Sequence, residues 1–259
     1  IKGTTRYQDS SQFRNHGTLT NMDPATDWMW SSTLNRWCLD FDGSNDHVLI
    51  GAGKVPILKT TAFTASCWLK MTAPLGVLFS NWDISDTPGW SFSIGDFGAT
   101  CPAIVFSDSG GGNYFGAVDG NSSVNDGTWK HIALVYNGSA LWTGISIYVN
   151  GVAHALTEKT LGTKDPGTLV DNYLAIGCRR LISSPNQLFT GQLSDQLIHL
   201  RALSAAEIRI LADPSNVMLG GLIVAPRRKL YLVKSSLIIP QTRLRLRSGL
   251  FTSTIFNRE

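Results

Sequence analysis

The chain has 259 residues, of which 43% are hydrophobic and 16% charged, so it can bury the core of one large domain with an appendage. No apolar run reaches the roughly 18 residues that a membrane-spanning helix needs, and we expect no transmembrane segment. Residues 1–225 hold 14 Lys and Arg against 18 Asp and Glu, a net charge of −4, whereas residues 226–259 hold 8 against 1, a net charge of +7. This asymmetry predicts an acidic partner for the C-terminal segment.

The front of the chain, residues 1–37, is polar and rich in turn formers. Its stretch Asp9–Leu19 contains Asp-Ser and Asn-His-Gly steps, which are typical of turns, and because few residues precede it we expect any strand there to be short, missing or supplied from elsewhere. The sequence opens on Ile1 rather than a start methionine and shows no signal peptide. We therefore expect a front that is processed, trimmed or incomplete.

From residue 38 to about residue 200, short runs rich in β-branched and aromatic residues follow one another. Turn pairs separate several of them, namely Asp42-Gly43, Asn137-Gly138 and Asn150-Gly151, because Asn, Asp and Gly accept positive φ at low cost. Regular short strands with such turns predict a sandwich of antiparallel sheets. The expected strands are 48–50, 62–71, 76–81, 90–94, 103–106, 114–118, 129–136, 144–149, 175–177 and 192–199.

One helix is expected after the last of these strands. Ser204 and Glu207 have the spacing of a capping box, in which the Ser hydroxyl accepts from the Glu207 amide and the Glu carboxylate accepts from the Ser204 amide. Apolar residues follow, and Asp213-Pro214 ends the pattern. The sequence therefore predicts one short helix that closes the domain.

Four segments read together carry a family resemblance: Cys38–Val48, Phe63–Lys70, Asp126–Tyr136, and Phe189–Asp195 leading into Arg201–Ile208. Their order and spacing resemble the laminin-G-like domains of the concanavalin A-like jelly-roll superfamily. The resemblance implies an all-β fold, a jelly-roll sandwich of two antiparallel sheets with one short C-terminal helix, over residues 1–213. It also implies that the domain binds glycans or other proteins, since only some relatives are glycosidases.

Residues 214–259 lie outside the usual extent of such a domain and form a basic C-terminal extension. Lys229–Val233 and Arg243–Arg247 alternate with period two, which is typical of a strand with one dry and one wet face. Nucleic-acid binding is disfavoured because few aromatic residues accompany the cations, and a membrane-surface helix is disfavoured because the period is wrong. We favour a β-forming assembly arm that contacts other protein subunits, either copies of this chain or a particle shell. Its candidate contact residues are Arg227, Arg228, Lys229, Arg243, Arg245 and Arg247.

The sequence argues against an enzyme. Glycosidases of this superfamily use paired carboxylates, typically glutamates at alternating strand positions, and this chain has only Glu158, Glu207 and Glu259. Asp40 and Asp42 have alternating spacing, but they lie beside an expected turn and are interpreted as turn and edge residues. We predict no catalytic residues and keep a glycoside hydrolase as the third functional alternative.

A structural calcium ion is an option that the resemblance raises, because many laminin-G-like relatives hold Ca²⁺ at the rim of the sandwich. Calcium binds six to eight hard oxygen ligands, whereas Asp is also a normal turn residue, and we favour the turn interpretation. No contiguous motif selects ligands, so no metal ligand is assigned. The candidates are Asp42, Asp46, Asp108, Asp119, Asp126 and Asp195.

Two loop-like stretches, residues 81–90 and 107–114, could converge to bind a sugar through exposed aromatic faces and polar groups. We expect Trp82 and Trp142 to be partly exposed, and we favour Trp90 and Tyr114 as core residues at strand starts. The candidate ligand-binding residues are Trp82, Asp83, Asp108, Asn113, Tyr114 and Trp142.

The chain is predicted to be a non-enzymatic recognition or display module. The specific hypothesis is a virion or particle component, such as a decoration or tail protein, located on a virion or extracellular surface and anchored by its basic arm. It accounts for an arm that needs a partner and for cysteines too sparse to form a disulfide framework. The alternative is a secreted or cell-surface domain for carbohydrate binding and adhesion.

The four cysteines, which we expect to be free and buried, are Cys38, Cys67, Cys101 and Cys178.

Overall fold

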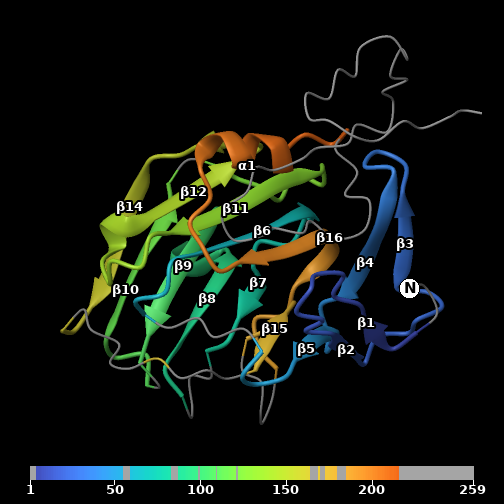
Figure 1. The fold of residues 1–259 in the computed structure, drawn as a ribbon, viewed down its shortest axis with the longest axis horizontal. Helices are drawn as coiled ribbons and strands as arrows, with labels where there is room; N and C mark the ends of the chain where they lie inside the picture. Colours follow the sequence, from blue (N-terminus) through green and yellow to red (C-terminus); the bar gives the residue numbers. More distant parts are fainter. Residues whose placement is uncertain are drawn as a thin grey trace, which may run out of the picture.

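The computed structural model describes residues 4–54, 59–82, 87–98, 100–108, 110–120, 122–163, 169, 173–179 and 185–215. Two antiparallel sheets pack face to face, and one short helix, α1 (Ala205–Leu211), lies on the outside of the sandwich (Figure 1). This confirms the predicted all-β sandwich of two antiparallel sheets.

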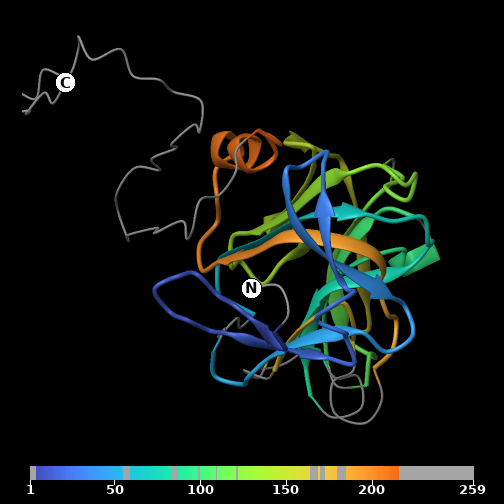
Figure 2. The ribbon, with the colours of Figure 1, turned by 90° about the vertical axis from the view of Figure 1, so that its right-hand side faces the viewer.

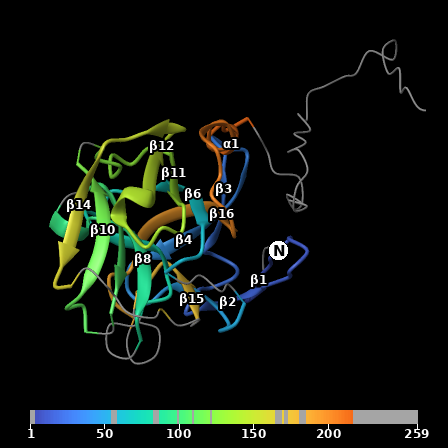
Figure 3. The ribbon, with the colours of Figure 1, turned by 60° about the vertical axis from the view of Figure 1, so that its left-hand side comes forward.

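The described residues form a nine-stranded sheet and a seven-stranded sheet, which face each other in Figures 2 and 3. The first contains, in spatial order, β1 (Arg6–Tyr7), β2 (Gly17–Thr20), β5 (His47–Ile50), β15 (Leu174–Ile176), β7 (Gly76–Ser80), β8 (Gly89–Ile94), β9 (Pro102–Ser107), β10 (Tyr114–Asp119) and β14 (Leu156–Leu161). The second contains β13 (Val152–Ala153), β12 (Ile145–Val149), β11 (Lys130–Tyr136), β6 (Phe63–Lys70), β16 (Thr190–His199), β4 (Arg36–Asp42) and β3 (Trp28–Ser31).

An aromatic layer between the sheets forms the centre of the core. Phe106 of β9 lies 4.7 Å from the ring of Tyr136 of β11 and 4.7 Å from the ring of Phe115 of β10. Phe63 of β6 packs 5.0 Å from Trp90 of β8, which is fully buried, as the sequence predicted for Trp90. Burying each side chain of this size stabilises the fold by about 1.5–3 kcal/mol, so this layer holds the two sheets together.

The predicted helix forms, and its capping box is present at Ser204 and Glu207. Helix α1 covers the outside of the seven-stranded sheet, where Leu203 and Ile208 pack with Ala133 of β11 in a second, smaller apolar cluster. The helix therefore closes a face of the sheet that would otherwise expose apolar side chains.

Four strands lie where the sequence predicted none. β2 and β3 fall in the segment 1–37, which was interpreted as turn-rich, β13 is the edge strand beyond β12, and β14 is the edge strand beyond β10. β3 is exposed on both faces, β14 has no buried residue and β13 has two residues, so the alternation that marks a half-buried strand is weak in them. β2 does alternate, but over four residues alone. The expected first strand is present but short, since β1 has two residues that pair with β2.

The hairpin of β3 and β4 is joined to the sheet by the backbone pairing of β4 with β16, and one buried cation adds a side-chain contact to it. Arg36 Nη1 forms an ion pair with Asp195, which has φ 48° at a bulge in β16, and Arg36 Nη2 donates to the carbonyl oxygen of Pro214 at 2.8 Å. Burial raises the pKa of the Asp195 carboxyl, and the Arg36 guanidinium opposes this rise. Arg36 therefore connects the hairpin, the bulge and the segment that follows α1.

Residues 216–259 lie outside the described part of the chain, and all six predicted arm residues fall there. The proposed boundary between residues 213 and 214 stays a prediction.

Within the described residues, no helix has both the length and the apolar character that crossing a membrane requires.

Arg36→Ala should lower the free energy of unfolding by about 3 kcal/mol, because it leaves the largely buried Asp195 carboxylate without its counterion. Chemical denaturation measures the change. The matched control is Arg201→Ala, which breaks the more exposed Arg201–Glu207 pair and should cost less than about 1 kcal/mol. Equal losses in the two variants would contradict the anchoring role of Arg36.

Candidate functional site

The face of the nine-stranded sheet that points away from the seven-stranded sheet, here called the outer face, carries the candidate site. Side chains alternate along a strand, so Trp90 and Phe92 of β8 enter the core while Ser91 and Ser93 point to the outer face. Both serines are fully buried. Other side chains must therefore cover this face.

A chain of polar contacts covers the outer face. Ser93 Oγ donates to Asp96 Oδ2 at 2.5 Å, and Arg179 Nη2 lies 2.6 Å from the same oxygen. The Arg179 guanidinium carbon lies 4.7 Å from the ring centroid of Trp82, and Trp82 Nε1 donates to the carbonyl oxygen of Asp108 at 2.9 Å. Burial lowers the pKa of Arg179 while Asp96 raises it. The contacts fix Trp82 and Arg179 in one arrangement.

The prediction that Trp82 is partly exposed is wrong, since only 4% of the residue is accessible. The reason lies in the strand that follows its loop. Gly89 lets the chain approach so closely that a Cβ at this position would lie 2.4 Å from Trp82 Cα. Trp142, in the 3₁₀ turn η2 (Trp142–Gly144), is half-buried against the main core, so its predicted partial exposure is confirmed.

Asp108 and Asn113 are brought together by the loop between β9 and β10. The Asp108 carboxylate accepts from the Gly112 amide and from Asn113 Nδ2, both at 2.8 Å, and Asn113 Oδ1 accepts from the Thr163 amide at 2.9 Å. Burial raises the pKa of Asp108, but these hydrogen bonds lower it more, and the net change is downward. Both side chains thus hold the loop in shape. Asp83 lies outside the described residues.

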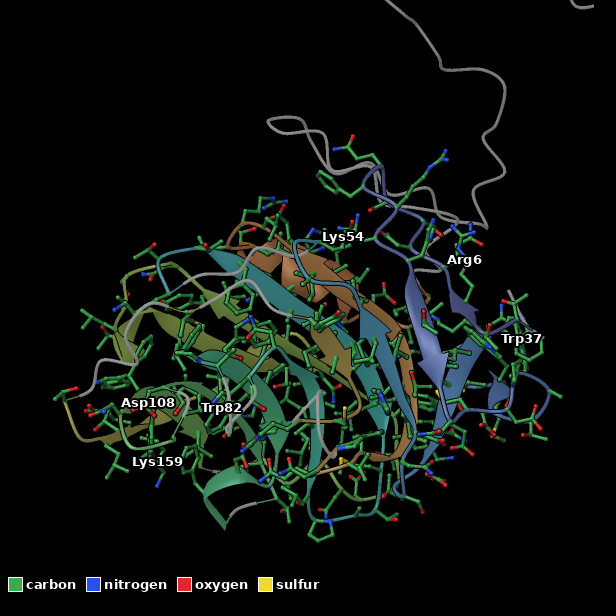
Figure 4. The ribbon with its side chains drawn as sticks, turned by 90° about the horizontal axis from the view of Figure 1, so that it is seen from below. Arg6, Trp37, Lys54, Trp82, Asp108 and Lys159 are labelled. Atoms are coloured by element: carbon green, nitrogen blue, oxygen red, sulfur yellow. The ribbon has the colours of Figure 1, made fainter. Side chains whose placement is uncertain are left out.

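The accessible part of this region is an aromatic rim, defined here as Phe97, Tyr114, Lys159 and Leu161. Phe97, in the short turn η1 (Asp96–Gly98), is 38% exposed, and its ring lies 5.9 Å from that of Tyr114. Lys159 Nζ lies 5.7 Å from the Phe97 ring centroid, and Leu161 pairs with Tyr114 across β14 and β10. Figure 4 shows Lys159, Asp108 and Trp82 on one side of the molecule and Trp37 on the other.

Tyr114 is therefore half-exposed on the outer face rather than in the core, which the sequence favoured. Phe97, Lys159 and Arg179 were missed. For Phe97 a local signal exists: Gly95 and Gly98 flank it, and both have positive φ, as has Phe97 itself at 63°. Such a turn presents its central side chain on the surface.

One cluster combines a hydroxyl, an imidazole and a carboxylate, but it lacks the geometry of a catalytic relay. Ser122 Oγ lies 2.5 Å from His154 Nδ1, and Asp119 Oδ2 lies 3.2 Å from the same nitrogen. In a hydrolase relay the hydroxyl and the carboxylate contact opposite ring nitrogens. This cluster therefore cannot pass a proton from Ser122 through the ring to Asp119.

The carboxylates of Asp42 and Asp46, at the end of β4 and just after it, accept hydrogen bonds from backbone amides of a turn. Asp42 Oδ1 accepts from the Ser44 amide at 2.7 Å, and Asp46 Oδ2 accepts from the Asp42 amide at 3.0 Å. The Ser44 hydrogen bond is the main cause that lowers the pKa of Asp42, whereas burial raises the pKa of Asp46. This agrees with the turn interpretation of Asp42. The prediction that the chain is not an enzyme stays a prediction.

Among the described residues, no three His, Cys, Asp or Glu side chains are grouped so that they could hold a metal ion. The predicted calcium ion therefore has no assigned ligands. Asp126, one of the candidates, binds Thr128 and Lys130 Nζ, the latter at 2.7 Å. Calcium also takes backbone carbonyl and water oxygens as ligands, and the calcium ion stays a prediction. All four cysteines are buried with free thiols.

A family model described as the concanavalin A-like lectin/glucanases superfamily matches residues 42–209. The chain belongs to this superfamily. The matched span begins at the last residue of β4 and ends within α1, so it includes the aromatic rim and the capping box.

Similar solved structures share the fold at low sequence identity. The binding domain of botulinum neurotoxin serotype D is 11% identical with a TM-score of 0.54, and the match covers 80% of this chain and 47% of that one. The mouse laminin α1 LG4-5 domains are 13% identical, with 64% and 43% coverage and a TM-score of 0.46. The Ruminococcus gnavus sialidase CBM40 bound to α2,3-sialyllactose is 15% identical, with 59% and 83% coverage and a TM-score of 0.46.

A curated relative, aspergillopepsin-1 of Aspergillus pseudoglaucus, is 27% identical over 128 residues, which cover 46% of this chain. The match spans 32% of that peptidase. The chain thus spans about a third of the curated relative and about half of the toxin domain.

Trp82→Ala should lower the free energy of unfolding by about 3–5 kcal/mol, because it empties a buried site and uncovers Arg179. The matched control is Trp30→Ala, since Trp30 is 51% exposed and should contribute less than about 1 kcal/mol. Urea denaturation followed by far-UV circular dichroism measures both. A Trp82 variant as stable as the Trp30 variant would contradict the buried placement of Trp82.

Proposed function

We propose that this chain is a non-enzymatic recognition module that binds a saccharide at the aromatic rim. The observation that carries the proposal is the exposed Phe97 ring, held 5.9 Å from Tyr114 with the Lys159 ammonium 5.7 Å from its centroid. Sugar rings stack on aromatic faces, which supply area, while nearby polar groups supply orientation. A rim made of these parts suits a sugar better than a flat protein surface.

The rigidity of the rim supports this proposal. Phe97 follows Asp96, whose carboxylate is held by Ser93 and Arg179, and Tyr114 follows Asn113, whose side chain is held by Asp108 and Thr163. Binding costs less conformational entropy when the contact side chains are already fixed. The family description also names lectins and glucanases, and both classes engage saccharides.

Lys159 defines the class of saccharide. An ammonium group beside the stacking ring attracts a carboxylate or sulfate on the bound sugar. We therefore propose an acidic saccharide as the ligand. Glycoside hydrolysis remains the less favoured alternative, because the described Asp42 and Asp46 carboxylates accept hydrogen bonds from turn amides.

We further propose that the chain is displayed on a virion or other extracellular particle and anchored by residues 214–259. The net charge of +7 in residues 226–259 and the period-two stretches around Arg243 and Lys229 support an arm that joins another protein subunit. The alternative is a secreted or cell-surface adhesion domain in which the same rim acts without assembly.

Phe97→Ala and Tyr114→Ala should each weaken saccharide binding about tenfold, because one stacking contact of about 1.4 kcal/mol is lost. An array of neutral, carboxylated and sulfated oligosaccharides selects the ligand, and calorimetric titration measures its affinity. Lys159→Gln should remove the preference for acidic members and the weakening by salt. The control is Phe13→Ala, an aromatic residue 66% exposed in the loop between β1 and β2. Unchanged affinity in both rim variants would contradict the site.

Deleting residues 226–259 should leave a folded monomer, whereas the full chain associates. Light scattering of both proteins measures their masses, and thermal unfolding with and without a chelator tests the optional calcium ion. Two monomers would refute the assembly role. Loss of folding in the truncated chain would place part of the arm in the core, and a chelator that lowers stability would support calcium.

A further inference from the structure

Strand β3 ends the seven-stranded sheet in the described part of the chain, and one face of its hairpin is apolar and exposed. Trp30 pairs with Trp37 across β3 and β4, with ring centroids 5.5 Å apart. They are 51% and 43% exposed. Trp28, on the same face, stacks 6.0 Å from Tyr7 and is half-buried. Exposed tryptophans next to a sheet edge are typical of an interaction surface.

The opposite face of the same hairpin is acidic. Asp27, immediately before β3, lies beside Asp40 of β4, whose amide donates to the Asp27 carbonyl oxygen at 2.8 Å. Burial is the largest cause that raises the pKa of Asp40, and the charge of Asp27 adds to it. Met29 and Cys38 pair on this face and leave Met29 39% exposed. The edge thus presents tryptophans on one face and carboxylates on the other.

A strand that pairs with this edge must match both faces. Because successive side chains of a strand point to opposite faces, it needs apolar residues that meet Trp30 and cations that meet Asp27 and Asp40. Arg243–Arg247, with the sequence Arg-Leu-Arg-Leu-Arg, has this alternation. An uncharged strand would add no cation to the acidic face, where Lys70 already lies near Asp40, and an evenly basic strand would place charges against the tryptophans.

We propose that Arg243–Arg247 of one copy pairs with the β3 edge of a second copy, placing its leucines on the tryptophan face and its arginines on the aspartate face. This inference rests on the assembly role proposed above and names its receptor site. The two copies exchange arms, so each supplies one edge and one arm, and the assembly closes as a symmetric dimer.

The position of the chain exit and the length of the arm allow it to reach the β3 edge of a second copy. Pro214 is held by Arg36, which pairs with Ser31 at the end of β3, so the arm leaves beside the edge it would cover. Residues 216–225, the first part of the arm, carry no charge and cannot match the aspartates. Residue 243 lies 28 positions beyond Ser215, a reach of up to roughly 90 Å when extended, which is enough for a neighbouring molecule.

The test uses full-length variants that damage either the edge or the arm. Trp30→Lys places a cation on the apolar face, and the triple variant Arg243→Glu, Arg245→Glu and Arg247→Glu reverses the charge of the arm. Each should raise the dimer dissociation constant at least tenfold in sedimentation equilibrium. The matched control is Val152→Lys, which lies on β13 at the other end of the same sheet and is 62% exposed, and it should not change association. Circular dichroism verifies folding.

Mixing the two damaged proteins distinguishes the possible results. The Trp30→Lys chain keeps an intact arm and the triple variant keeps an intact edge, so the equimolar mixture should form a heterodimer that neither forms alone. Trp30→Lys that associates like the unmodified chain would overturn the docking site while leaving the assembly role standing. No heterodimer in the mixture would overturn exchange between copies. A full chain that is monomeric at all concentrations would overturn the assembly role itself.

Discussion

The apolar layer shared by the two sheets is the constraint on which the rest of the molecule depends. Phe63, Trp90, Phe106 and Tyr136 pack within this layer, and the alternation of strand residues then assigns every neighbouring side chain to an outer face. Ser91 and Ser93 are on the outer face because Trp90 and Phe92 are in the core. The position of the outer face is thus fixed by the packing of the opposite side of the same strands.

The outer face differs from an open groove, because a polar layer is built on it. Asp96 binds both Ser93 and Arg179, and Arg179 packs on Trp82. A charge pair buried in this way adds little net stability, but it has one satisfied arrangement and therefore orients what is attached to it. Here the attached residue is Phe97, directly after Asp96. The polar layer covers the middle of the outer face, so the exposed side chains of this region lie at the aromatic rim.

The fold could be predicted from local signals, whereas the site could be predicted only in part. The capping box of Ser204 and Glu207 and the turn pairs act over a few residues and were identified correctly. Asp108 and Asn113 were correctly brought into one loop. The burial of Trp82 depends on the close approach at Gly89 and on the contact with Arg179, and the second of these is distant in sequence, so no local pattern reports it. The same holds for Trp30, whose exposure follows from the position of β3 at the end of its sheet.

Arg36 also determines how a mechanical load would enter the domain. It holds the Pro214 carbonyl just before residues 216–259 begin, and it forms an ion pair with Asp195 in β16, whose neighbours are β4 and β6. A pull on the C-terminal segment would first meet this contact and would then act along strands joined by many parallel hydrogen bonds. Those bonds must break together rather than one by one. The C-terminal segment is therefore attached near the β3 end of the seven-stranded sheet, and a pull on it would load that end first.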